Sequence, residues 1–251
     1  MLIWIILFSI LGSVGAITIA GIFVFLGDNI QKTLIPILIA FATGVLLTVA
    51  FIGLIPEAIE QVGEPHLIMP FILGGILFFF IMEKIVIWRN CRDKTCEVHS
   101  HASGPIILMG DSLHNLTDGI VIAAAFLSGL NLGIVAGLTI IVHELSHETA
   151  DFGILLHSGY SKKKAFFYNM ISSSTTIPAS IVSYFILDSI ESAVPFLLAI
   201  SAASFIYIAL SDLTPDLHQH TDFKYIVRQL LVIIIGIVLM ALILSIGGHQ
   251  H

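Results

Sequence analysis

Charged residues are scarce in this chain of 251 residues. Only 11% of the residues are charged and 57% are hydrophobic, whereas a soluble domain carries about 25% charged residues. The mean hydropathy is correspondingly high, at +1.03. This composition excludes an ordinary soluble domain and predicts an all-α, polytopic protein of the lipid bilayer, because helices satisfy their own backbone hydrogen bonds there.

Positive charge and cysteine are scarcer still. Ten Lys and Arg stand against 17 Asp and Glu, which gives a formal net charge of −7. A nucleic-acid partner is excluded, since that function needs a basic patch and none is present. The two cysteines, Cys91 and Cys96, share one loop that we place in the cytosol, where a structural disulfide is not expected.

Long apolar stretches are abundant, and eight of them are long enough to cross a bilayer, which takes about 20 residues. They cover residues 2–26, 34–56, 67–88, 105–128, 132–156, 165–187, 193–215 and 225–247. The first carries no charge and exceeds the roughly 7–15-residue core of a cleavable signal peptide, so we expect it to be a spanning helix. The eight helices are expected to form one domain over residues 1–251, with a polar loop at 89–104.

The basic residues all fall on one side of the membrane if eight helices cross it. They flank the odd-numbered loops: Lys32, Lys84, Arg89, Arg92, Lys94, Lys162, Lys163, Lys164, Lys224 and Arg228. The positive-inside rule then predicts that these loops, including 89–104, are cytoplasmic and that both termini lie outside the cell membrane.

The opposite face gathers acids: Glu57, Glu60, Glu64, Asp188 and Glu191. Topology alone explains why Lys and Arg are missing there, but it does not explain the accumulated carboxylates. An acidic outer mouth would concentrate cations by its local potential.

A short internal echo predicts an inverted repeat. The second span ends in Leu54-Ile55-Pro56-Glu57 and the seventh in Leu213-Thr214-Pro215-Asp216, although the two cross in opposite directions. Proline is common near helix ends, so the match by itself could also arise by chance. Its placement favours a transporter plan in which helices 1–3 and 6–8 are repeats around helices 4 and 5.

Two polar stripes interrupt the fourth and fifth spans. Residues three and four apart share one face of a helix, and the residues on these two faces are Asp111, His114, Asn115 and Asp118, then His143, Glu144, His147, Glu148 and Asp151. The link at 128–133 is short enough to make the helices antiparallel neighbours. The stripes are therefore expected to face each other near the middle of the membrane.

Ionisable residues at bilayer depth are costly and mark functional sites. Imidazole, carboxylate and amide oxygen together suit a divalent transition metal. Facing stripes could hold two cations, with Asp118 alone or Asp118 and His147 between them. The alternative is that these groups only hydrogen-bond across the helices. That alternative explains a single polar residue better than nine of them.

The segment from His143 to His147 also fits the His-Glu-x-x-His pattern of zinc proteases. Such an enzyme needs a third protein ligand and an open coordination position. Membrane proteases with this motif take that ligand from a downstream Asp, whereas Asp118 lies upstream. We therefore favour transport without enzymatic activity and keep an intramembrane metalloprotease as the alternative.

Four segments resemble, in the same order, signatures of the ZIP (zinc- and iron-regulated transporter-like) family: 54–58, 114–119, 143–148 and 205–216. The resemblance covers the whole chain. It implies an eight-helix carrier, often a homodimer, that moves Zn²⁺, Fe²⁺, Mn²⁺, Cd²⁺ or similar ions into the cytosol through a binuclear site on helices 4 and 5. The ion is the substrate, and no prosthetic group is implied.

Carried over by position, the resemblance implies one metal on His114, Asp118, His143 and His147, and a second on Asn115, Asp118, Glu144 and His147. Two departures bear on that site. Ser146 stands where the family commonly has Pro, and the sixth helix offers Asn169 and hydroxyl residues where some members have an acid. The family's histidine-rich loop is reduced here to Cys96, His99 and His101.

The remaining candidate residues define an expected metal path. A cation would enter past Glu57 and the neighbouring acids. It would pass the polar stripes, which also carry Asp111, Glu148 and Asp151. The expected exit is marked by Asp212, Asp216, His218 and His220.

Overall fold

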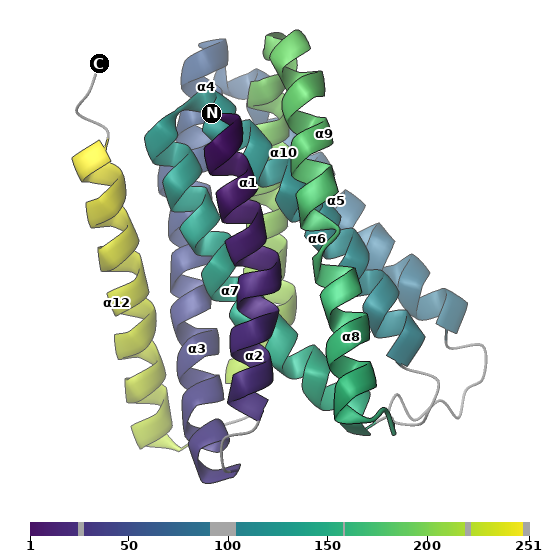
Figure 1. Cartoon of the computed structure of the whole chain (residues 1–251). Coiled ribbons are helices and arrows are strands. Elements are labelled where there is room, and N and C mark those ends of the chain that lie inside the picture. Colours follow the sequence, from purple (N-terminus) through teal and green to yellow (C-terminus); the bar gives the residue numbers. More distant parts are fainter. Residues whose placement is uncertain (25–27, 91–103, 158, 219–221, 248–251) are drawn as a thin grey trace.

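A computed structural model describes residues 1–24, 28–90, 104–157, 159–218 and 222–247, drawn as ribbons in Figure 1. Every regular element in these ranges is a helix, and they contain no strand. The all-α prediction is therefore confirmed.

Several membrane-spanning segments combine more than one helical element. The N-terminal rod consists of α1 (Leu2–Ile10), the π-helix η1 (Leu11–Gly15) and α2 (Ala16–Val24), and the next of α3 (Asp28–Thr48), η2 (Val49–Leu54) and α4 (Ile55–Val62). Single helices follow: α5 (Pro65–Asn90), α6 (Gly104–Ser128) and α7 (Leu130–His157). The rest comprises α8 (Lys162–Ser173), α9 (Thr176–Ser189), η3 (Glu191–Ala193), α10 (Val194–Tyr207), η4 (Ile208–Leu213), α11 (Thr214–Leu217) and α12 (Phe223–Gly247).

The span expected at 165–187 is broken in the structure between α8 and α9. The Ser174 hydroxyl donates to the Met170 carbonyl at 2.5 Å, and the Thr175 hydroxyl donates to the carbonyls of Ser172 and Ser112 at 2.8 and 2.9 Å. Hydroxyls that bond to nearby carbonyls compete with regular helical hydrogen bonding. Hydropathy alone does not reveal such a break.

Seven helical segments of the described chain are long and apolar enough to cross a membrane. The 25-residue α6 is not among them, although it is only slightly shorter than α5 and α7, which have 26 and 28 residues. It carries the first polar stripe, which lowers its hydropathy. The chain is thus a polytopic membrane protein, and the count of eight crossings stays a prediction.

The pair α6 and α7 forms the centre of the bundle. The two helices run antiparallel on either side of Gly129 and contact each other. α6 also packs on α9 and α10, while α7 packs on α2 and α3. Each polar stripe is consequently enclosed by other helices.

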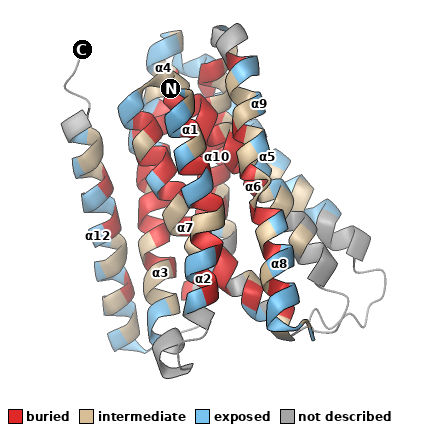
Figure 2. Cartoon of the chain, in the orientation of Figure 1, coloured by how far each residue is buried: buried red, intermediate tan, exposed pale blue. Residues whose placement is uncertain are grey.

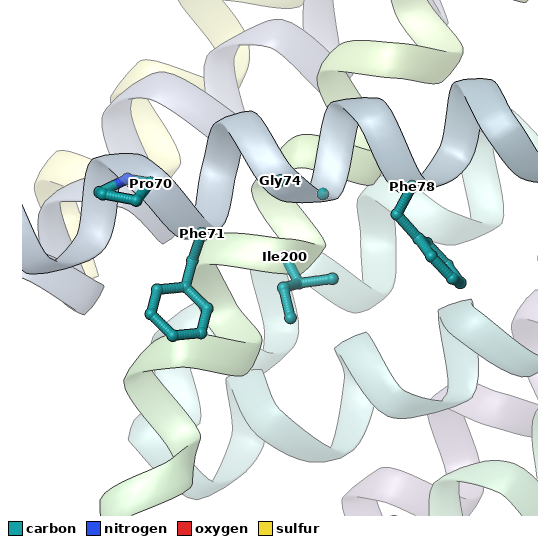
Figure 3. A pocket seen from close by; sticks show the side chains of 6 residues that line it. Pro70, Phe71, Gly74, Phe78 and Ile200 are labelled. Atoms are coloured by element: carbon teal, nitrogen blue, oxygen red, sulfur yellow. The ribbon is translucent and has the colours of Figure 1, made fainter.

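The outermost helices are α5 and α12, whose outer faces are largely exposed in Figure 2. α5 packs mainly on α10 and α12 on α3. Their exposed side chains are large and apolar, among them Phe78, Ile81 and Ile235, as expected of faces that contact lipid. An apolar cavity of about 500 Å³ lies beside α5, lined by Pro70, Phe71, Gly74, Gly75, Phe78 and Ile200 (Figure 3).

Glycine allows α12 to approach α3 closely. A Cβ atom at Gly44 would lie 2.4 Å from the Ile233 carbonyl oxygen, and one at Gly236 would lie 2.8 Å from the Phe41 carbonyl oxygen. Helices in lipid have no hydrophobic driving force to associate, and small residues let their backbones approach closely enough for van der Waals packing. The contact is reciprocal, because each helix contributes one of the two glycines.

The internal echo in the sequence corresponds to a shared local structure. The π-helices η2 and η4 each have six residues and end two residues before Pro56 and Pro215, respectively. Proline has no N–H to donate to the carbonyl four residues back, and those carbonyls, of Ile52 and Ser211, lie inside the π-helices. Moreover, η2 contacts α10 and η4 contacts α3. The two segments are thus related in local geometry and in packing.

The start of α1 and the end of α12 lie at the same end of the bundle (Figure 1). Chain ends on one side require an even number of crossings.

Candidate metal site

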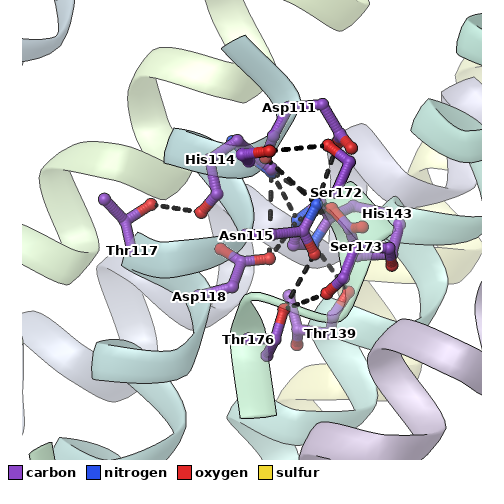
Figure 4. A network of polar contacts seen from close by, with 12 residues as sticks. Asp111, His114, Asn115, Thr117, Asp118, Thr139, His143, Ser172, Ser173 and Thr176 are labelled. Atoms are coloured by element: carbon purple, nitrogen blue, oxygen red, sulfur yellow. Dashed lines mark hydrogen bonds and ion pairs between the residues drawn. The ribbon is translucent and has the colours of Figure 1, made fainter. Parts of the chain in front are cut away.

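The two central helices bring four metal-ligating side chains together, which we call the mixed cluster: His114, Asp118, His143 and Glu144. One ligand atom from each lies within 4.8 Å of the others. His114 and Asp118 are one turn apart on α6, whereas His143 and Glu144 are adjacent on α7. Figure 4 shows the site from close by.

The closest distances in the mixed cluster converge on two imidazole nitrogens. His143 Nε2 lies 3.0 Å from Asp118 Oδ2, and His114 Nε2 lies 3.2 Å from Glu144 Oε1. The two Nε2 atoms are themselves 3.2 Å apart. An ion between these atoms would meet two imidazoles and two carboxylates, a ligand set that suits first-row divalent metals.

The backbone fixes the orientation of one of these imidazoles. His143 Nδ1 lies 3.1 Å from the Thr139 carbonyl oxygen. A carbonyl can only accept, so Nδ1 carries the proton and, in the neutral ring, the Nε2 lone pair faces the other ligands. Such an outer hydrogen bond is the usual way in which a metal-binding histidine is held.

The mixed cluster is enclosed by protein. Asp118, His143 and Glu144 have no exposed surface, and the side chain of His114 is 17% exposed. In every ion pair of this cluster among the described residues, the basic partner of the carboxylate is a histidine. Buried carboxylates need a compensating positive charge, which protonated imidazole or a bound cation can supply.

His147 lies beside the mixed cluster without joining it. Its ring stacks on His114 with the centroids 5.0 Å apart and is 6.1 Å from the ring of His143. Its Nε2 atom is buried and has no hydrogen-bond partner among the described residues. The family resemblance implies that His147 is a ligand, and the structure stacks its ring on that of His114.

Asn115, the predicted ligand of the second metal, is engaged elsewhere. Its Oδ1 accepts from the Thr176 hydroxyl on α9 at 2.8 Å, and its Nδ2 donates to Asp111 Oδ1, also at 2.8 Å. Gly119 permits this contact between α6 and α9, because a Cβ there would lie 2.5 Å from the Thr176 carbonyl oxygen. The amide therefore links α9 to Asp111.

A second group of ligand atoms, the carboxylate cluster, consists of Asp111, Glu144 and Glu148. Their oxygens lie within 4.8 Å of one another, and all three residues are buried. Glu144 belongs to both clusters. Asn169, on α8, donates from Nδ2 to Glu148 Oε2 at 2.5 Å. Sequence spacing indicated the Asp111 and Glu148 faces but not this partner, which comes from another helix.

Asp111 and Glu148 are the predicted path residues that belong to the carboxylate cluster. The other predicted path residues lie outside both clusters or outside the described residues. Glu57 is half-buried in α4 and accepts from Gln61 at 2.7 Å, Asp151 is half-buried in α7, and His218 is exposed. The side chains of Asp212, Asp216 and Ser146 lie outside the described residues, as do Cys91, Cys96, His99, His101 and His220.

One half-buried polar contact was not predicted from the sequence. The Tyr207 hydroxyl on α10 donates to Glu83 Oε2 on α5, and the Ser211 hydroxyl lies 3.4 Å from the same oxygen. An ionisable residue within an apolar span is itself a signal of function. That signal was available in the sequence at Glu83.

Known proteins resemble this chain over most of its length. A family model described as ZIP Zinc transporter matches residues 1–105 and 89–244. Zinc transporter zipt-7.2 of Caenorhabditis elegans is 30% identical over 269 residues, which cover 84% of this chain and 58% of the relative. The Zinc transporter ZIP13 homolog of Drosophila melanogaster is 27% identical, with 96% and 90% covered. Zinc transporter ZIP13 of Pongo abelii is 29% identical, with 82% and 65% covered. The chain thus spans less than two thirds of the first and third of these relatives.

Proposed function

Because this chain belongs to the ZIP zinc transporter family, we propose that it carries divalent transition-metal ions, Zn²⁺ foremost, across the membrane into the cytosol. The observation that supports this most strongly is the mixed cluster, in which two imidazoles and two carboxylates converge in the middle of α6 and α7. Three of its four residues have no exposed surface. An ion that enters the bundle loses hydration water, and these ligands replace that water.

We assign the primary metal position to His114, Asp118, His143 and Glu144. His147 completes it from the side, since its ring already stacks on His114. This assignment differs from the set implied by the family resemblance, because Glu144 Oε1 lies within 3.4 Å of both Nε2 atoms. Selectivity among Zn²⁺, Fe²⁺, Mn²⁺ and Cd²⁺ then rests on the geometry of these ligands more than on their chemical type.

The direction of transport rests on the charge distribution. We place the basic loops in the cytoplasm and the acids near Glu57 outside, so that the outer mouth attracts cations. Alternating access would arise from movement of the two repeat segments, which contain η2 and η4, against α6 and α7. The reciprocal contacts of η2 with α10 and of η4 with α3 couple the two repeats.

The His-Glu-x-x-His segment has no proteolytic role in this proposal. The chain is a member of a family of transporters and not an enzyme. Glu144 lies 3.2 Å from the imidazole of His114, so its carboxylate is engaged by a metal-ligating group. Here Glu144 acts as a ligand.

The test is metal uptake into proteoliposomes that contain the purified full-length chain. A zinc-sensitive dye enclosed in the vesicles reports the entry of Zn²⁺. Cd²⁺, Fe²⁺ or Mn²⁺ added outside then competes with Zn²⁺ for uptake. We expect uptake by the wild type and none by His143→Ala. The matched control is His66→Ala, which removes an exposed histidine from the start of α5. The absence of Zn²⁺ entry into wild-type vesicles would refute the proposal, as would normal uptake by His143→Ala.

A further inference from the structure

The carboxylate cluster lies beyond the mixed cluster, towards Gly104 at the start of α6 and His157 at the end of α7. Asp111 precedes His114 by three residues, and Glu148 follows Glu144 by four, so both are displaced by about one turn in the same direction along the antiparallel pair. In our topology this direction leads to the cytoplasm.

In the carboxylates of Asp111 and Glu148, one of the two oxygens has no hydrogen-bond partner among the described residues. Asp111 is 7% exposed and Glu148 is fully buried. Asp111 Oδ2 and Glu148 Oε1 are buried atoms without a hydrogen-bond partner among the described residues. Leaving such oxygens unpaired in the protein interior is costly, which indicates a missing positive partner.

The other oxygen of each of these carboxylates is held by an asparagine. Asn115 donates to Asp111 Oδ1 at 2.8 Å, and Asn169 donates to Glu148 Oε2 at 2.5 Å. These two bonds restrict rotation of both carboxylates. The arrangement is that of oriented ligands backed by neutral donors, as around bound metals.

Asn169 itself provides an independent sign of a ligand. It is fully buried, and its Nδ2 also lies 3.4 Å from the Glu148 carbonyl oxygen. Its amide oxygen, in contrast, has no hydrogen-bond partner in the described structure. A buried neutral oxygen without a donor beside unpaired carboxylates is suited to a cation and not to an anion.

We propose that Asp111, Glu144 and Glu148 form the second cation position of this chain, with Asn169 as its positioning residue. The position favours a divalent cation for which oxygen ligands are well suited, such as Mn²⁺, over one for which imidazole is well suited, such as Zn²⁺. It replaces the set containing Asn115, whose amide oxygen is bonded to Thr176. This inference rests on the proposed transport function, because in it a transported ion binds the carboxylate cluster after it leaves the mixed cluster.

The test counts metal ions bound to the purified full-length chain in lipid nanodiscs. Equilibrium dialysis against Zn²⁺ and Mn²⁺, followed by elemental analysis, gives the equivalents per chain, and electron paramagnetic resonance reports bound Mn²⁺. We expect two equivalents for the wild type and one for Asp111→Asn and Glu148→Gln. The matched control Asp222→Asn changes an exposed acid at the start of α12 and keeps both equivalents. Asn169→Ala should weaken the second equivalent about 10–100-fold, as loss of an outer hydrogen bond does.

The outcomes separate this inference from the transport function. One equivalent retained by Glu148→Gln shows that the variant is folded, and should it fail to fold, Asn169→Ala carries the test. Two equivalents of unchanged affinity in Asp111→Asn, Glu148→Gln and Asn169→Ala would mean that protons neutralise the carboxylates, which overturns the proposal. A wild type that takes up Zn²⁺ but binds one equivalent also overturns it while leaving the transport function intact.

Discussion

The mixed cluster and the carboxylate cluster share Glu144 but differ in how their charge is balanced. In the mixed cluster, two imidazoles lie within 3.0–3.4 Å of carboxylate oxygens. The carboxylate cluster contains no histidine, and amides hold its outer members. The first can therefore be neutralised by its own histidines between transport events, whereas the second depends on protons or on a cation from outside. In our proposal, the two cation positions are therefore neutralised in different ways when no cation is bound.

Removing a ligand from the mixed cluster is expected to have the largest effect on zinc uptake. Asp118→Ala deletes the carboxylate that lies 3.0 Å from His143 Nε2. Loss of an outer hydrogen bond alone costs about 10–100-fold in metal affinity, so loss of the ligand should lower zinc uptake by more than ~100-fold. Proteoliposome uptake measures the effect, and the gel-filtration profile should match that of the wild type. Uptake near the wild-type rate would remove Asp118 from the site.

A methyl group at Gly119 should disturb the mixed cluster through packing. Its Cβ would lie 2.5 Å from the Thr176 carbonyl oxygen and 2.8 Å from the Ser180 nitrogen, so Gly119→Ala must separate α6 from α9. Overpacking of this kind costs about 1–3 kcal/mol. We expect a lower midpoint of thermal unfolding together with weaker zinc binding.

The matched control for that variant is Gly74→Ala, because a Cβ at Gly74 would meet nothing within 4 Å. Equal melting temperatures for Gly119→Ala and Gly74→Ala would contradict the close approach of α6 and α9.

The Thr176 hydroxyl should matter more to the second metal equivalent than to the first. Thr176→Val removes the bond to Asn115 Oδ1 and loosens the amide that orients Asp111. One hydrogen bond is worth about 0.5–1.5 kcal/mol, equivalent to roughly a 2–13-fold change in affinity. Titration with Mn²⁺ measures it. Thr149→Val is the control, since the Thr149 hydroxyl bonds within its own helix at 2.7 Å; an equal effect of the two variants would refute the link through Asn115.

The smallest expected effect lies outside both clusters. Tyr207→Phe removes the hydroxyl that donates to Glu83 and loosens α5 from α10 by about 1 kcal/mol. We expect metal stoichiometry to stay unchanged and the uptake rate to change only a few-fold, with Tyr168→Phe, an exposed tyrosine of α8, as the control. A lost metal equivalent would place Glu83 in the metal path.

Sequence spacing predicted which residues share a face of α6 and α7, because helix periodicity and a short link determine those faces. It did not predict the partners supplied by other helices. Asn169 is 21 residues from Glu148, and Thr176 is 61 residues from Asn115. Both contacts depend on how closely α8 and α9 approach the central pair, and that distance is set by packing at residues such as Gly119. A helical wheel contains no such information. The expectation that Asn115 is a ligand comes from the family resemblance, and it stays a prediction.

The π-helices η2 and η4 make the number of residues in their two segments as important for the fold as the identity of those residues. A π-helical turn holds one residue more than an α-helix needs. Deleting a single residue between Val49 and Leu54 would let regular α-helical bonding continue and would rotate everything beyond it by about 100°. Glu57, only three residues past η2, would then point to another side of the bundle. Single-residue insertions and deletions should therefore be tolerated far less at 49–54 and 208–213 than conservative substitutions are.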